Sequence, residues 1–127
     1  VFIEIEEYSL AATLCARALD ICQETNQPLG IAEAYKFLGR LYARKKEWTA
    51  ARGLLERSRQ VYQAFNNPLG AAEAQRELGE LYLAQNEVVA ATNEIHAALR
   101  TFQDICAGHD VVVTNKILEE LVVLESN

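Results

Sequence analysis

The sequence contains no methionine, only two prolines and six glycines, and three cysteines in 127 residues. So few turn-forming residues exclude an architecture rich in β-turns and leave no room for a long flexible linker. Because methionine is absent, we expect a piece of a longer polypeptide. The start of the sequence has no charged-then-apolar leader, so no signal peptide is visible in it. The three cysteines have no zinc-type spacing, so we interpret them as free thiols in a reducing, cytoplasmic compartment.

Long apolar runs and an excess of positive charge are also missing. No apolar stretch approaches the roughly 18 residues that a membrane span requires, so we expect no membrane partner. The net charge is −6, which argues against a nucleic-acid partner, since phosphate contacts need a basic surface. Half of the residues are hydrophobic and 24% are charged, as in an ordinary soluble globular domain.

What the sequence does contain is an internal repeat with a period of 40 residues. Residues 26–65 begin NQPLGIAEAYKFLGRLY and residues 66–105 begin NNPLGAAEAQRELGELY, and the two segments match at 15 of 40 positions. Repeats of this length indicate stacked supersecondary units. We therefore divide the single domain 1–127 into a half-repeat over 1–25, the two full repeats, and a half-repeat over 106–127.

Each repeat has the pattern of two helices. Pro28 and Pro68 suit a first helical turn, where the missing N–H has no intrahelical partner, and Asn67 can cap that turn. We predict no strand. Residues 1–6 are expected to be the end of an earlier helix, and six further helices are predicted over 7–25, 28–44, 48–65, 68–84, 88–105 and 111–125. Apolar spacing in the second helix of each repeat predicts these buried positions: Ala51, Leu55, Ser58, Tyr62, Ala91, Ile95, Ala98 and Phe102.

The repeats resemble the tetratricopeptide (TPR) signature, W-x2-L-G-x2-Y followed by A-x3-F. The matching residues are Tyr35, Leu38, Gly39, Tyr42, Ala51 and Leu55, then Gln75, Leu78, Gly79, Tyr82, Ala91 and Ile95. The resemblance covers nearly the whole chain, although Glu119 replaces the glycine in the last unit. The long period is similar to that of TPR repeats in spindle-orientation scaffolds and in bacterial signalling ATPases and transcription activators. This resemblance implies an all-α fold, a right-handed α-solenoid of antiparallel helix pairs (a TPR-like superhelix) with about six helices.

Residues that could carry chemistry are few. The two histidines, His96 and His109, lack a cysteine or acid at ligand spacing, and no phosphate-binding or dinucleotide motif is present. Cys15 and Cys22 fall in predicted core columns, where cysteine acts as a small hydrophobe, whereas we expect Cys106 to be exposed. We expect no enzymatic activity, no catalytic residue, no metal site and no cofactor.

Basic residues recur in one column of the first helices. Lys36, Arg40 and Arg44 are spaced four apart on one helix face, and eight of the 12 basic residues lie between Lys36 and Arg59. The TPR resemblance implies that this face lines a concave surface where peptides lie. We hypothesise a basic strip that binds an acidic partner segment, formed by Lys36, Arg40, Arg44, Arg76 and Lys116. The alternative is that these charges solvate exposed faces and pair with acids one turn away.

The last predicted helix is apolar on too many sides for an exposed element. Either a further helix of a longer parent protein covers it, or another copy of the chain does. The second case predicts self-association into a homo-oligomer through an exposed repeat end, at Val113, Val123 and Leu124. Taken together, these features predict a protein–protein interaction module that binds a protein or peptide partner within a larger cytoplasmic scaffold. The alternative is an effector-sensing regulatory domain of a signalling ATPase or transcription activator.

Overall fold

The computed structural model describes residues 2–126, with side chains from Glu7 onward. In this part of the chain there are six α-helices and no strand, which confirms the predicted all-α fold. The helices are α1 (Phe2–Glu24), α2 (Pro28–Arg44), α3 (Trp48–Ala64), α4 (Pro68–Ala84), α5 (Val88–Asp104) and α6 (Gly108–Ser126). The bounds of α2 to α5 agree with the prediction to within one residue.

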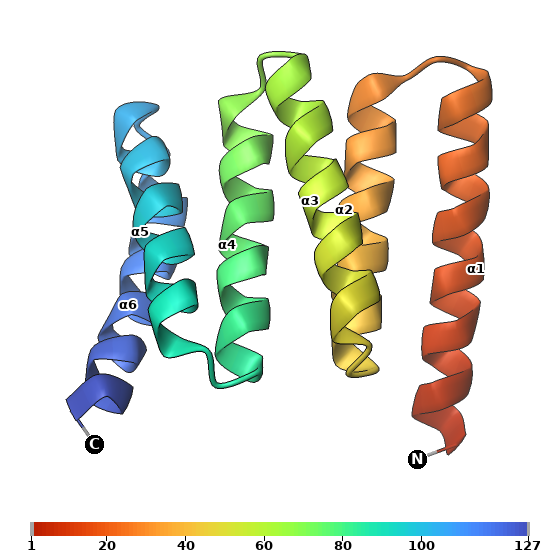
Figure 1. Ribbon diagram of the computed structural model, residues 1–127. Coiled ribbons are helices and arrows are strands. Elements are labelled where there is room, and N and C mark those ends of the chain that lie inside the picture. The colour runs from red at the N-terminus through yellow and green to blue at the C-terminus, as the bar shows by residue number, and fades with distance from the viewer. Residues whose placement is uncertain (1, 127) are drawn as a thin grey trace.

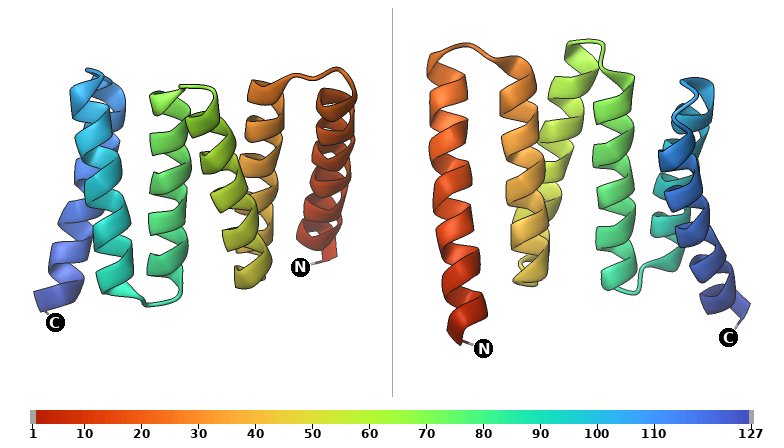
Figure 2. Two further views of the ribbon diagram at one scale, coloured as in Figure 1. Left: turned by 45° about the horizontal axis from the view of Figure 1, so that its top comes forward. Right: turned by 180° about the vertical axis from the view of Figure 1, so that it is seen from behind.

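The helices stack in chain order, and each packs antiparallel against the next (Figure 1). Helices α3 and α5 lie in front of α2 and α6 in Figure 1, and the order is reversed when the molecule is seen from behind (Figure 2). The stack therefore has two broad surfaces. We call the surface formed by α2, α4 and α6 the even face, and the surface formed by α1 and the second helices α3 and α5 the odd face.

The same tight turn joins every pair of consecutive helices. Each three-residue connection contains one non-glycine residue in the left-handed region, with φ between 53° and 63°. The residue after it donates its N–H back to the preceding helix, as Glu47 N does to Tyr42 O at 3.0 Å, which is the Schellman arrangement. Three of the five left-handed residues are asparagines, but the others are Lys46 and Cys106.

The predicted helix starts and core are confirmed. Pro28 and Pro68 occupy the first turns of α2 and α4, and the Asn67 side chain accepts a hydrogen bond from Gly70 N at 2.9 Å. All eight predicted core positions of α3 and α5 are buried, including Tyr62 and Phe102. The core therefore lies between the two helices of each repeat and between one repeat and the next.

Two glycines permit close helix crossings within the repeats. A Cβ atom on Gly39 would lie 2.7 Å from Cγ of Leu55, and one on Gly79 would lie 2.6 Å from Cγ1 of Ile95. Real Cβ atoms do not approach neighbours so closely, so the facing helix would have to shift or its side chain rearrange. Gly39 and Gly79 are therefore packing glycines.

The two ends of the chain differ from the prediction. The expected helix break near residue 6 is wrong, because α1 is continuous over Phe2–Glu24, a segment with no glycine, asparagine or proline to form a turn. Val1 lies outside the described residues. The last helix begins at Gly108 rather than at residue 111. The three-residue turn before it is the same as the other four turns, and the negative charge of Asp110 stabilises the N-terminal turn of α6. His109 therefore lies in a helix and not in a loop.

Candidate functional site

The five residues of the predicted basic strip lie on even-face helices, but they do not form a continuous free surface. Lys36 is only 6% exposed. Its Nζ lies 2.8 Å from Glu73 Oε2 on α4 and 3.6 Å from Glu33 Oε1 on its own helix. The ion pair with the neighbouring helix is the shorter one, so Lys36 joins α2 to α4 and is not available to a ligand.

A buried tyrosine completes the surroundings of Lys36. Tyr62 Oη on α3 donates a hydrogen bond to Glu33 Oε1 at 2.7 Å, and Lys36 Nζ lies 5.7 Å from the centre of the Tyr62 ring. Burial, and then the hydrogen bond to Glu33, raise the pKa of Tyr62, so its hydroxyl stays protonated and acts as a donor. This cluster connects three helices.

Arg76 and Arg40 make similar connections. Arg76 Nη1 lies 3.0 Å from Asp110 Oδ1 on α6, and its guanidinium lies 5.4 Å from the Phe102 ring, which repeats the arrangement of Lys36 over Tyr62. Arg40 Nε lies 3.4 Å from Glu77 Oε1 on α4. The expectation of an uninterrupted basic strip is therefore corrected, because carboxylates from the next even-face helix reach these three cations.

The two remaining strip residues, Arg44 and Lys116, are exposed. Among the side chains described, no carboxylate lies within ion-pairing distance of either one. Arg44 ends α2, whereas Lys116 lies in the middle of α6. Of the predicted strip, only these two cations have no ion pair among the described side chains.

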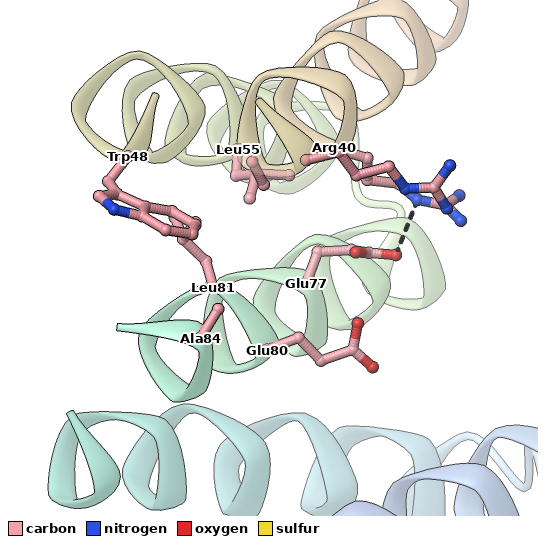
Figure 3. Close-up of a pocket in the computed structure, with 9 residues that line it drawn as sticks. Arg40, Trp48, Leu55, Glu77, Glu80, Leu81 and Ala84 are labelled. Carbon is pink, nitrogen blue, oxygen red and sulfur yellow. Dashed lines mark ion pairs between the residues drawn. The ribbon is translucent and has the colours of Figure 1, made fainter. Parts of the chain in front are cut away.

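Arg44 borders two cavities, and Arg40 lines both with it. One cavity, of about 250 Å³, lies between α2, α3 and α4 (Figure 3). The other, of about 270 Å³, lies between α1 and α2 and includes Cys15 and Phe37. We call the two together the even-face groove.

The first cavity of this groove combines an apolar wall with charges of both signs. Trp48 and Leu81 lie on its apolar side, and the Arg40–Glu77 pair and Glu80 lie on the other (Figure 3). Partial burial of its carboxyl and the negative charge of Glu77 raise the pKa of Glu80. An apolar side chain fits against Trp48, while a carboxylate suits Arg44. Trp48 was not among the predicted site residues, and its one signal in the sequence was that it is the only tryptophan of the chain.

The other candidate residues do not form a site. His96 and His109 are exposed on different helices, and the described part of the chain holds no cluster of three metal-ligating side chains. Cys106 is exposed as predicted, and Cys15 and Cys22 are only half-buried. None of the described helices is long and apolar enough to cross a bilayer.

The predicted self-association end is only partly exposed. Val123 and Leu124 are 59% and 48% exposed at the end of α6, whereas Val113 is half-buried. Of the three predicted residues, only the two in the last turns of the helix are therefore exposed.

The likeness of this chain to known proteins is one of fold. No protein-family model matches the sequence, and no curated protein matches it. A structure described as the crystal structure of BtubC (BKLC) from P. vanneervenii superposes with a TM-score of 0.67 at 13% sequence identity. The match covers 96% of this chain but only 59% of the other, so the chain spans about three fifths of that protein's length. At this identity, the similarity shows a shared all-α fold of stacked helices.

Proposed function

We propose that the chain is a non-catalytic, TPR-like interaction module of a cytoplasmic scaffold and that it binds a peptide segment of a partner protein in the even-face groove. The observation that carries this proposal is the position of Arg44, an exposed cation without an ion pair among the described residues, next to the apolar wall at Trp48. The resemblance of both repeats to the TPR signature supports the same role.

The chemistry of the groove favours a particular kind of segment. A carboxylate of the partner pairs with Arg44, and an apolar side chain enters the cavity against Trp48 and Leu81. Arg40 is already paired with Glu77, so it contributes less than the sequence suggested. The charge contact is exposed to solvent, and salt should weaken it, because exposed charges are screened over about 8–10 Å at physiological ionic strength.

Trp48 provides the experiment, because the emission of a single tryptophan reports directly on the groove. The probes are short synthetic peptides that carry one glutamate and one leucine at varied spacing, with glutamine analogues as controls. We expect saturable changes in Trp48 emission with glutamate peptides. The change should be weaker at high salt, lost in Arg44→Glu and retained in Arg100→Glu, which reverses an exposed charge on α5. Equal binding by both variants, or by glutamine peptides, would refute the proposed site.

An effector-sensing domain of a signalling ATPase or transcription activator is the alternative. Such a domain binds a compact small molecule, and pockets for drug-sized ligands usually enclose about 300–1,000 Å³. The two cavities of the even-face groove, about 250 and 270 Å³, are smaller than this range and suit single side chains of a peptide. Taken singly, the cavities of this groove therefore support the peptide-binding role proposed for it.

A further inference from the structure

A second groove lies on the odd face, away from the residues considered so far. Its volume is about 410 Å³, and it runs between α1 and α3, with Leu38 and Tyr42 of α2 among its lining residues. Ala12 and Ala16 line it from α1, and Gly53 and Arg57 line it from α3. We call it the odd-face groove. It shares no residue with the even-face groove.

Gly53 is not explained by packing within the chain. A Cβ atom on Gly53 would meet no atom within 4 Å, in contrast to the crowded positions of Gly39 and Gly79. A glycine inside a helix costs about 1 kcal/mol relative to alanine. A glycine is also typical of places where a ligand or another backbone approaches closely. Gly53 therefore leaves open a space that no described part of the chain fills.

The repeat supplies an internal comparison. One period after Ala12 and Ala16, α3 carries Arg52 and Glu56, and one period after Gly53, α5 carries Asn93. The interval between α3 and α5 thus has long or polar side chains where the interval between α1 and α3 has small ones. The combination of Ala12 and Ala16 on one wall with Gly53 on the other is therefore specific to the first interval and is not a general property of the repeat.

Arg57 gives this groove its charge. It is exposed, and its guanidinium lies 5.9 Å from the ring centre of Tyr35, which holds it at the groove. In the described side chains, no carboxylate forms an ion pair with it. Arg57 lies one helical turn from Gly53 on α3. An acidic group on an occupant would therefore complement it.

We propose that the odd-face groove docks an amphipathic helix of a partner protein. Helices α1 and α3 run in the same general direction (Figure 1). Both contribute lining residues to the groove, and the small ones among them let a third helix approach both backbones closely. The occupant places an apolar side chain over Gly53, toward Leu38 and Tyr42. It carries a carboxylate one turn along the helix, where it pairs with Arg57.

Backbone NMR titration tests this proposal, because it reports where a ligand binds. The probes are helical peptides of alanine and leucine with a glutamate one turn from a leucine, and a glutamine analogue of each. We expect saturable shifts at the amides of Ala16 and Gly53 with the glutamate peptides. Gly53→Gln should fill the groove and weaken binding by about tenfold or more, and Arg57→Glu should abolish the preference for glutamate.

Asn93→Gln, at the position equivalent to Gly53 on α5, is the matched control and should bind like the parent. Circular dichroism of every variant checks that the helices remain folded. The proposal is overturned if shifts appear at Trp48 instead, if Gly53→Gln binds as well as Asn93→Gln, or if no peptide gives saturable shifts. It is also overturned if the same amides shift with protein concentration alone, because a second copy of the chain would then be the occupant.

Discussion

Gly79→Ala and Gly53→Ala add the same methyl group to two helix interiors, and we expect opposite effects on stability. At Gly53 the space is open, so the better helix propensity of alanine should stabilise the fold by about 1 kcal/mol. At Gly79 the same gain is opposed by contact with Ile95, whose Cγ1 would lie 2.6 Å from the new Cβ, and with Ala91 O at 3.4 Å. Overpacking of this kind costs about 1–3 kcal/mol.

The propensity gain is common to both variants and cancels in their comparison. The difference between their free energies of unfolding therefore measures the overpacking at Gly79 alone, and we expect about 1–3 kcal/mol. Urea denaturation followed by Trp48 emission gives both values. If Gly79→Ala stabilises the protein as much as Gly53→Ala does, then α5 moves aside without cost, and the close crossing contributes nothing to stability.

A double-mutant cycle identifies the contact responsible. Ile95→Ala removes the side-chain atoms that crowd Gly79 and should itself cost about 2–5 kcal/mol, so the cycle is best measured in the Gly53→Ala background to keep the chain folded. In the absence of the isoleucine side chain, Gly79→Ala should become neutral or stabilising. A penalty that persists without Ile95 would assign the crowding to the α5 backbone at Ala91.

Three further predictions concern the turns, the groove and the chain end. Cys106→Gly should increase the free energy of unfolding by about 1 kcal/mol more than Asn86→Gly, because a side chain other than asparagine costs more in the left-handed turn. Thermal denaturation measures both variants, and equal shifts of the thermal midpoint would contradict this prediction. The raised pKa of Glu80 means that its carboxylate is disfavoured in the folded state. Glu80→Gln should therefore increase the free energy of unfolding at neutral pH. This increase should vanish below about pH 4.3, the pKa of a glutamate in the unfolded chain, because the carboxyl is then protonated in both states. Urea denaturation at several pH values measures it, and an increase that does not depend on pH would show another cause. Val123→Asp combined with Leu124→Asp should reduce self-association in sedimentation equilibrium, and a parent chain that is monomeric at all concentrations would end that prediction.

The helices and core were predictable because their causes are local or periodic. Pro28 and Pro68 mark helix starts, and the apolar spacing of the second helices identified every one of the eight core positions tested. The third and fifth helices were each predicted to end one residue too late, and the error is the same for the turn with Asn66 as for the turn with Cys106. The start of the sixth helix was missed because Gly108 stands one period after Pro68, where a proline would have marked the first turn.

The ion pairs across the even face could not be predicted from the repeat. A period of 40 aligns Lys36 with Arg76 and Lys116, but it does not say which acid of the next helix each cation meets. Lys36 reaches an acid 37 residues ahead, whereas Arg76, its equivalent, reaches one 34 residues ahead. The different separations arise because Glu73 has no acidic counterpart one period later, where Val113 stands. The available partners, and not the repeat, decide how much of the predicted strip stays free.

The charge at the repeat position of Arg40 differs between even-face helices. One and two periods later the same column carries Glu80 and Glu120, so its charge changes from positive on α2 to negative on α4 and α6. The charges of Arg40 and Glu120, as well as that of Glu77, act on the pKa of Glu80, so these side chains interact electrostatically. If the proposed function holds, a peptide that crosses from α2 to α4 meets Arg44 first and the carboxylates of Glu77 and Glu80 later. Its favoured orientation then has the acidic end at α2 and any basic residues toward α4, because the reverse orientation would bring like charges together.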